Sequence, residues 1–134
     1  MLSYSGYQPL ALPMKKIYYH KLIRDRIPDV IRKKGARYVI KKLSAKRFEV
    51  ELLKKVGEEA TGLLSAKNKH ELTSELADIH EVLETIRKYK KIKPSCLRDE
   101  LKKNMKRKGG FKKRLYLEWA EDNGYRTNER TYKK

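Results

Sequence analysis

The chain has 134 residues, of which 35 are Lys or Arg and 17 are Asp or Glu, so its formal net charge is +18. This length suits a single domain, and so large a positive excess predicts attraction to polyanions such as nucleotides, nucleic acid or an anionic membrane. One cysteine, Cys96, excludes an internal disulfide and a thiolate metal motif, and no apolar run approaches the ~18 residues that span a bilayer. We therefore expect a cytoplasmic protein with no part in a membrane.

The two ends of the chain show no helical or strand period. Residues 1–13 carry Tyr, Pro and Gly without apolar periodicity, and they have no basic region followed by an apolar stretch of the kind that begins a secretory signal. Residues 123–134 are polar and basic. We expect a flexible N-terminal extension over 1–13, one helical domain over 14–122 and a basic C-terminal tail over 123–134.

The first predicted element is a short helix that begins after Pro28, a residue suited to the first helical turn, and ends at Gly35. The run 37–43 then brings Tyr38 and its apolar neighbours, which favour an extended conformation. The run is too short for a sheet of its own. It is therefore either one short strand or an extended connector packed on helices.

Two long helices follow. Ser44 is a natural N-cap for a helix over 45–66. Asn68 with Glu71 three residues later resembles a capping box, and it predicts a second helix that runs to about Tyr89. Because only a few residues connect the two helices, we expect them to pack as antiparallel neighbours.

The last predicted elements follow Pro94, which begins a helix from Cys96 to about Lys108 that stops at a Gly-Gly pair. The amphipathic segment 115–120 predicts one more short helical piece. The fold class expected from these elements is all-α, an antiparallel helical hairpin or bundle with at most one short strand near 37–43.

Carboxylates lie on the apolar faces of the two long helices, within a segment from 49 to 84 that has nine acidic residues against four Lys. Glu59 projects into the apolar stripe of the first helix, while Glu75 and Asp78 lie one turn apart on the flank of the second. A carboxylate turned toward an apolar interface needs a proton, a Lys or Arg, or a metal, because an unpaired buried charge costs several kcal/mol. Mg²⁺ binds oxygen ligands of this kind, so the pattern predicts a magnesium site across the hairpin.

Basic residues precede the first predicted helix. Lys21, Arg24 and Arg26 admit two interpretations. One is a solvated basic face. The other is a phosphate clamp in which Arg24 binds phosphate oxygens and Asp25 fixes its orientation.

Four short motifs carry a resemblance to a known family. Glu58-Glu59-Ala60-Thr61 matches the start of a Glu-Glu-x-x-Glu motif on one helix, and Glu75-Leu76-Ala77-Asp78 matches a Glu-x-x-Asp motif on the next. With them, the sequence resembles the all-α NTP pyrophosphatase superfamily, the MazG-like and phosphoribosyl-ATP pyrophosphohydrolase-like proteins. The flanks, Lys-Leu-Ile-Arg-Asp-Arg-Ile-Pro over 21–28 and Arg-Lys-Gly-Gly-Phe over 107–111, are similar to the branch of house-cleaning pyrophosphatases for noncanonical nucleotides.

The resemblance implies a reaction and a set of roles. The reaction is hydrolysis of a nucleoside triphosphate to a monophosphate and pyrophosphate, on noncanonical or phosphoribosyl nucleotides, with Mg²⁺ or Mn²⁺ as cofactor. The implied metal ligands are Glu59, Glu75 and Asp78, the implied catalytic residues are Glu58 and Glu59, and the implied substrate-binding residues are Lys21, Arg24, Asp25, Arg107 and Lys108. Superfamily members associate through their apolar helix faces, so we expect a homodimer or a higher homo-oligomer.

One position departs from the family motif, because Gly62 stands where the resemblance places a third metal-ligating Glu. Mg²⁺ tolerates water ligands, so an ion could bind with water at the vacant position. The alternative is a protein that has kept the fold and lost catalysis. In that case a helical module that binds nucleic acid through its basic surface is the competing hypothesis.

Overall fold

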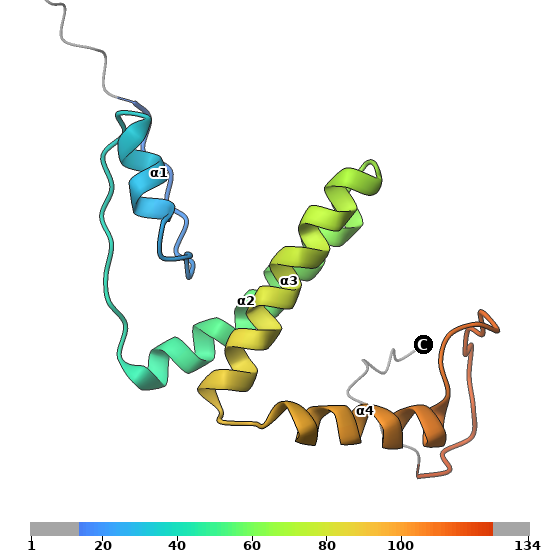
Figure 1. The fold of residues 1–134 in the computed structure, drawn as a ribbon. Helices are drawn as coiled ribbons and strands as arrows, with labels where there is room; N and C mark the ends of the chain where they lie inside the picture. Colours follow the sequence, from blue (N-terminus) through green and yellow to red (C-terminus); the bar gives the residue numbers. More distant parts are fainter. Residues whose placement is uncertain (1–13, 125–134) are drawn as a thin grey trace, which may run out of the picture. The chain divides into compact units, whose positions relative to one another are not determined.

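The computed structural model describes residues 14–124, so the predicted extension over 1–13 and residues 125–134 of the predicted tail lie outside the described residues. Four helices form the regular structure of the described chain: α1 (Ile27–Lys33), α2 (Ala45–Ser65), α3 (Lys69–Tyr89) and α4 (Pro94–Lys108) (Figure 1). The described residues divide into two compact units, one that ends at Lys93 and contains α1 to α3 and one that begins at Pro94 and contains α4.

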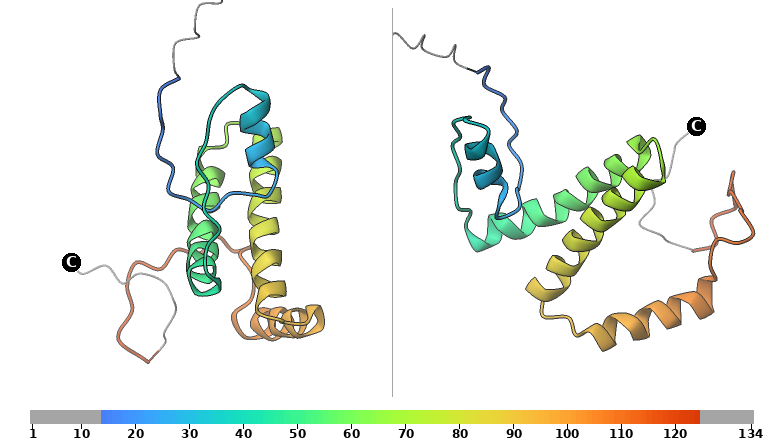
Figure 2. Two further views of the ribbon diagram at one scale, coloured as in Figure 1. Left: turned by 90° about the vertical axis from the view of Figure 1, so that its left-hand side faces the viewer. Right: turned by 45° about the horizontal axis from the view of Figure 1, so that its top comes forward.

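α2 and α3 pack against each other as a helical hairpin and lie side by side in both views of Figure 2. The Oγ atom of Ser44 accepts a hydrogen bond from the backbone N–H of Arg47 (3.3 Å), and Oδ1 of Asn68 accepts one from the N–H of Glu71 (2.9 Å). Each N-cap thus satisfies a donor that the first helical turn leaves unpaired. The predicted all-α class, the two caps and the hairpin are confirmed.

At the open end of the hairpin, side chains at the start of α2 contact side chains at the end of α3, as expected for antiparallel neighbours. The rings of Phe48 and Tyr89 meet edge to face with centroids 5.2 Å apart, and the Tyr89 hydroxyl donates to the carbonyl of Ala45 at 3.0 Å. Lys90 forms an ion pair with Glu49 at the same end. These contacts fix the relative register of the two helices far from the turn that connects them.

The hairpin encloses a small core. Leu52 of α2 and Val82 of α3, 4% and 9% exposed, are the buried apolar residues of the described chain. Other apolar side chains of the two helices stay about half exposed, among them Leu53, Leu76 and Leu83. A two-helix layer therefore leaves much of its apolar surface uncovered.

The structure decides between the alternatives for one segment and contradicts the prediction for another. The run 37–43 contains no strand and connects α1 to α2, but residues 37–42 are exposed, Val39 at 93%, so the connector does not have the predicted packing on helices. A single strand has no partner for its backbone groups within residues 14–124. The segment 115–120 is not helical, so that prediction was wrong. Six residues form too few hydrogen bonds to offset the cost of starting a helix.

None of the helices between residues 14 and 124 combines the length and apolar character needed to cross a lipid bilayer.

Truncating the core should separate buried from exposed leucines. Leu52→Ala is expected to lower the free energy of unfolding by about 2 kcal/mol or more, because it removes a buried side chain and leaves a cavity. Leu64→Ala is the matched control on the same helix, since Leu64 is 90% exposed; its effect should stay within about 0.5 kcal/mol. Urea unfolding followed by circular dichroism measures both, and equal losses would contradict the placement of the core.

Candidate metal centre

Three carboxylates from the two long helices converge on one point. Glu59 projects from α2, and Glu75 and Asp78 project from α3 one turn apart. One oxygen atom of each lies within 4.8 Å of the others, and all three residues are partly buried. The antiparallel packing of α2 on α3 produces this convergence, because it sets the last third of α2 opposite the first half of α3.

The donor set suits a hard divalent cation. Two oxygens bound to one Mg²⁺ at 2.0–2.1 Å are at most about 4.2 Å apart. Of three oxygens in an octahedral site only one pair can lie on opposite sides of the ion, and the other pairs are about 3 Å apart. The three oxygens, which lie within 4.8 Å of one another, would therefore close by up to about 2 Å on binding, through rotations about the Glu and Asp side-chain bonds. Three carboxylates also leave room for the several waters that Mg²⁺ keeps.

Lysines neutralise the α2 side of the cluster. Lys55, whose side chain is only 11% exposed, donates to Oε1 of Glu58 at 3.0 Å and lies 3.6 Å from Oε1 of Glu59. Lys21 donates to the same Oε1 of Glu58 at 3.0 Å, from 37 residues away in the sequence. Partial burial acts to raise the pKa of the Glu58 carboxyl, but the hydrogen bonds and charges of Lys21 and Lys55 outweigh it, so the pKa is lowered.

An arginine pairs with one of the two carboxylates on the α3 side. Nη1 of Arg24 donates to Oδ1 of Asp78 at 3.2 Å, and the two side chains are 64% and 41% exposed. An exposed pair of this kind contributes about 1 kcal/mol or less. Together with Lys21, Arg24 fastens the segment that precedes α1 to both helices of the hairpin. Because these pairs are weak, an arriving dication or a phosphate group can replace them.

Gly62 lies where the carboxylate of Glu75 crosses from α3 toward α2. A Cβ atom added at position 62 would lie 2.8 Å from the carboxyl carbon of Glu75, and closer still to Oε2. No real side chain tolerates that separation without a shift of Glu75. The Glu75 carboxylate therefore occupies space that only a glycine leaves free.

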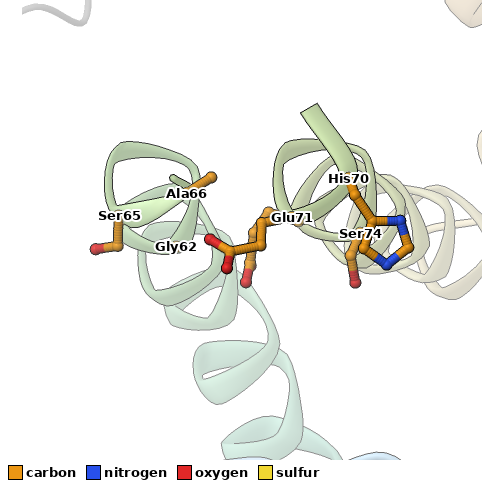
Figure 3. Close-up of a pocket in the computed structure, with 7 residues that line it drawn as sticks. Gly62, Ser65, Ala66, His70, Glu71 and Ser74 are labelled. Carbon is orange, nitrogen blue, oxygen red and sulfur yellow. The ribbon is translucent and has the colours of Figure 1, made fainter. Parts of the chain in front are cut away.

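A shallow hollow of about 250 Å³ adjoins this point near the turn of the hairpin. Figure 3 shows Gly62 and Ser65 of α2 on one side of it and Glu71 and Ser74 of α3 on the other. Glu71 is engaged locally, because its Oε2 accepts a hydrogen bond from the backbone N–H of Lys67 at 2.7 Å. It completes the N-terminal cap of α3 and is not one of the three converging carboxylates.

Of the other predicted site residues, Asp25 belongs to the first unit and Arg107 and Lys108 belong to the second. Asp25 is exposed, and within residues 14–124 the side-chain partner of Arg24 is Asp78 instead. Arg107 and Lys108 end α4 in the second unit, where Arg107 donates to Oδ1 of Asn104 at 3.4 Å. The substrate-binding roles of Asp25, Arg107 and Lys108 stay predictions.

Two features of the site escaped sequence reasoning. Lys55 precedes Glu58 and Glu59 by three and four residues, a helical spacing that indicates ion pairs and that could have identified it. The contact of Glu75 with the space at Gly62 carries no such signal, because it depends on the register between two helices.

Comparison of the chain with protein-family models, with curated proteins and with solved structures gave no match. The resemblance to NTP pyrophosphatases therefore rests on the motifs of the sequence.

Acid should weaken the fold through Glu58. Its pKa is lower in the folded chain than its ordinary value of 4.5, so the ion pairs with Lys21 and Lys55 stabilise the fold above that pH. The stabilisation is lost as the pH falls through the lowered folded pKa. Between pH 6 and 3 the melting temperature of the wild type should fall by roughly 2–5 °C more than that of Glu58→Gln. Parallel curves for the two proteins would contradict this coupling.

Proposed function

We propose that this protein is a Mg²⁺-dependent nucleoside triphosphate pyrophosphohydrolase that converts an NTP to an NMP and pyrophosphate, acting on noncanonical or phosphoribosyl nucleotides. The observation that carries the proposal is the convergence of Glu59, Glu75 and Asp78 from two helices on one point. An acidic cluster in a chain of net charge +18 needs a specific reason, and a metal that receives a phosphate-rich substrate provides one.

The chain's own residues have distinct tasks in this proposal. Glu59, Glu75 and Asp78 would hold the ion, which would neutralise charge on the phosphates and lower the pKa of a bound water. Glu58 lies beside the ligand Glu59 and accepts hydrogen bonds from two lysines. Its position beside Glu59 suits Glu58 to orient the attacking water, which is the task we assign to it.

Lys21 and Arg24 serve two states of the site. Without substrate they pair with Glu58 and Asp78. With a dication beside the carboxylates, Lys21 and Arg24 would be available to bind the triphosphate. The guanidinium of Arg24 suits phosphate oxygens because it offers several donors in one plane.

Pyrophosphate release from a panel of triphosphates tests the proposal. We expect turnover that requires Mg²⁺ and that falls by at least about 100-fold in Glu75→Gln and in Asp78→Asn, because each change removes a charged ligand. Glu81→Gln is the matched control on α3, since Glu81 is exposed and lies outside the cluster; it should keep wild-type activity. An absence of turnover with any triphosphate would contradict the proposal.

A second candidate function is nucleic-acid binding by a helical module, and the second unit favours it. Phe111, Tyr116 and Trp119 are 96%, 85% and 76% exposed and adjoin a basic run over 102–114. Basic residues attract phosphates, and exposed rings stack on bases. RNA binding that weakens steeply with salt yet ignores Mg²⁺ and Asp78→Asn, with no pyrophosphate released, would favour this function over the enzyme.

We further propose that the hairpin associates with a second copy of the chain, as the uncovered apolar faces of α2 and α3 suggest. Leu76 and Leu83 lie on one stripe of α3 and are 50% and 49% exposed. Burying such side chains contributes ~25 cal/mol per Å² of apolar area. A homodimer or a higher homo-oligomer would provide that burial.

Sedimentation equilibrium at micromolar concentration measures the oligomeric state. The wild type is expected to have at least the mass of a dimer, and Leu83→Glu is expected to shift it to the monomer, because a charge at the centre of an apolar interface is costly. Leu117→Glu on the second unit, where Leu117 is already 71% exposed, is the control that should leave the mass unchanged. A wild type of monomer mass would contradict the association.

A further inference from the structure

Gly62 and Glu75 occupy complementary places across the hairpin, one on α2 and one on α3. The carboxylate of Glu75 reaches so close to α2 that a Cβ atom at position 62 would lie 2.8 Å from its carboxyl carbon and 3.4 Å from its Oε1, with Oε2 nearer still. Side chains do not approach one another so closely. The space at position 62 is therefore filled by an acidic group from the other helix.

We infer that Gly62 is a positioning residue. Because it has no side chain, it leaves a space in which the Glu75 carboxylate lies, and we call this space the seat. The seat thereby sets the spacing of the three carboxylates. This inference rests on the proposed function where it concerns metal binding. It also explains why a glycine stands where the family motif has a Glu. The site would use three carboxylates, and the Glu75 carboxylate occupies the space that a side chain at position 62 would need.

The second glycine of α2 shows that the seat is specific. A Cβ atom added at Gly57 would meet nothing within 4 Å, although Gly57 and Gly62 lie on the same helix and neither has a positive φ. Both glycines weaken the helix by the same propensity effect. Of the two, Gly62 alone faces the carboxylate cluster, so the two positions form a matched pair.

A side chain added at position 62 would collide with the flexible end of Glu75. The effect of a substitution there therefore depends on how Glu75 moves. In Gly62→Ala the Glu75 carboxylate has to rotate away, at a cost that partly offsets the gain in helix propensity but leaves the hairpin folded. The carboxylate would then leave the place from which its oxygen lies within 4.8 Å of those of Glu59 and Asp78. The expected loss is in the geometry of the cluster rather than in the fold.

Titration with Mn²⁺, followed by the paramagnetic relaxation of water protons, tests the inference on the full chain. We expect Gly62→Ala to bind Mn²⁺ about tenfold more weakly than the wild type, which corresponds to ~1.4 kcal/mol. Gly57→Ala should bind Mn²⁺ as the wild type does. Equal affinities for Gly62→Ala and the wild type would overturn the inference.

Shortening the acidic side chain separates positioning from a general effect on the helix. An aspartate in place of Glu75 does not reach the seat, so Gly62→Ala should cause no further loss of affinity in a Glu75→Asp background. A purely structural effect of the Gly62→Ala substitution would instead weaken binding by the same factor in both backgrounds, and that result would overturn the inference.

Thermal unfolding without metal tests the placement of the Glu75 carboxylate beside Gly62 even if the protein binds no metal. Gly57→Ala should raise the melting temperature through helix propensity, and Gly62→Ala should raise it less unless Glu75→Ala is also introduced. A wild type that binds no Mn²⁺ would overturn the proposed function alone. Equal gains in melting temperature for Gly57→Ala and Gly62→Ala would overturn the seat.

Discussion

The need to neutralise carboxylates at the seam of a two-helix hairpin governs the arrangement of this molecule. Glu59, Glu75 and Asp78 are partly buried where α2 meets α3. Charges in such a place are stable only with partners, because partial burial removes water that would otherwise solvate them. Lys55 of α2 pairs with Glu59, and Arg24, from the segment that precedes α1, pairs with Asp78. Lys21 of the same segment pairs with Glu58, the neighbour of Glu59. The position of that segment on the hairpin follows from the charge of the seam.

This arrangement joins the two interpretations of the basic residues before α1. They are exposed cations, as a solvated basic face would be, and two of them reach carboxylates of the hairpin. The pairs carry little free energy, because their side chains remain in contact with water. Under the proposed function, weak pairing would let Lys21 and Arg24 exchange a carboxylate for a phosphate, which a tightly buried salt bridge at the same place would prevent.

Local signals made much of the fold predictable. Ser44 and Asn68 are N-caps whose hydrogen bonds form as their sequence contexts predict. Pro28 lies in the first turn of α1, and Gly35 follows the end of that helix. The failures came where a local pattern lacked support from the rest of the chain. Tyr38 and its neighbours had no strand to pair with among the described residues, and the segment 115–120 was too short to sustain a helix.

The candidate site was predictable to a different extent. Helical spacing placed Glu75 and Asp78 on one flank of α3, and an apolar stripe identified Glu59, so their convergence could be expected before the register was known. The seat at Gly62 could not be expected, because it depends on how far one carboxylate extends across the gap between two helices. Sequence patterns identify side chains, whereas the relevant feature of position 62 is the absence of a side chain.

The three-residue connection between α2 and α3, from Ala66 to Asn68, has a kinetic consequence. Contacts between residues close in sequence form quickly, since little chain entropy is lost when a short loop closes. Glu59 and Asp78 meet through that connection, so the acidic cluster is assembled in the same event that closes the hairpin. The segment with Lys21 and Arg24 must cross a much longer stretch of chain, and its arrival is a later step of folding.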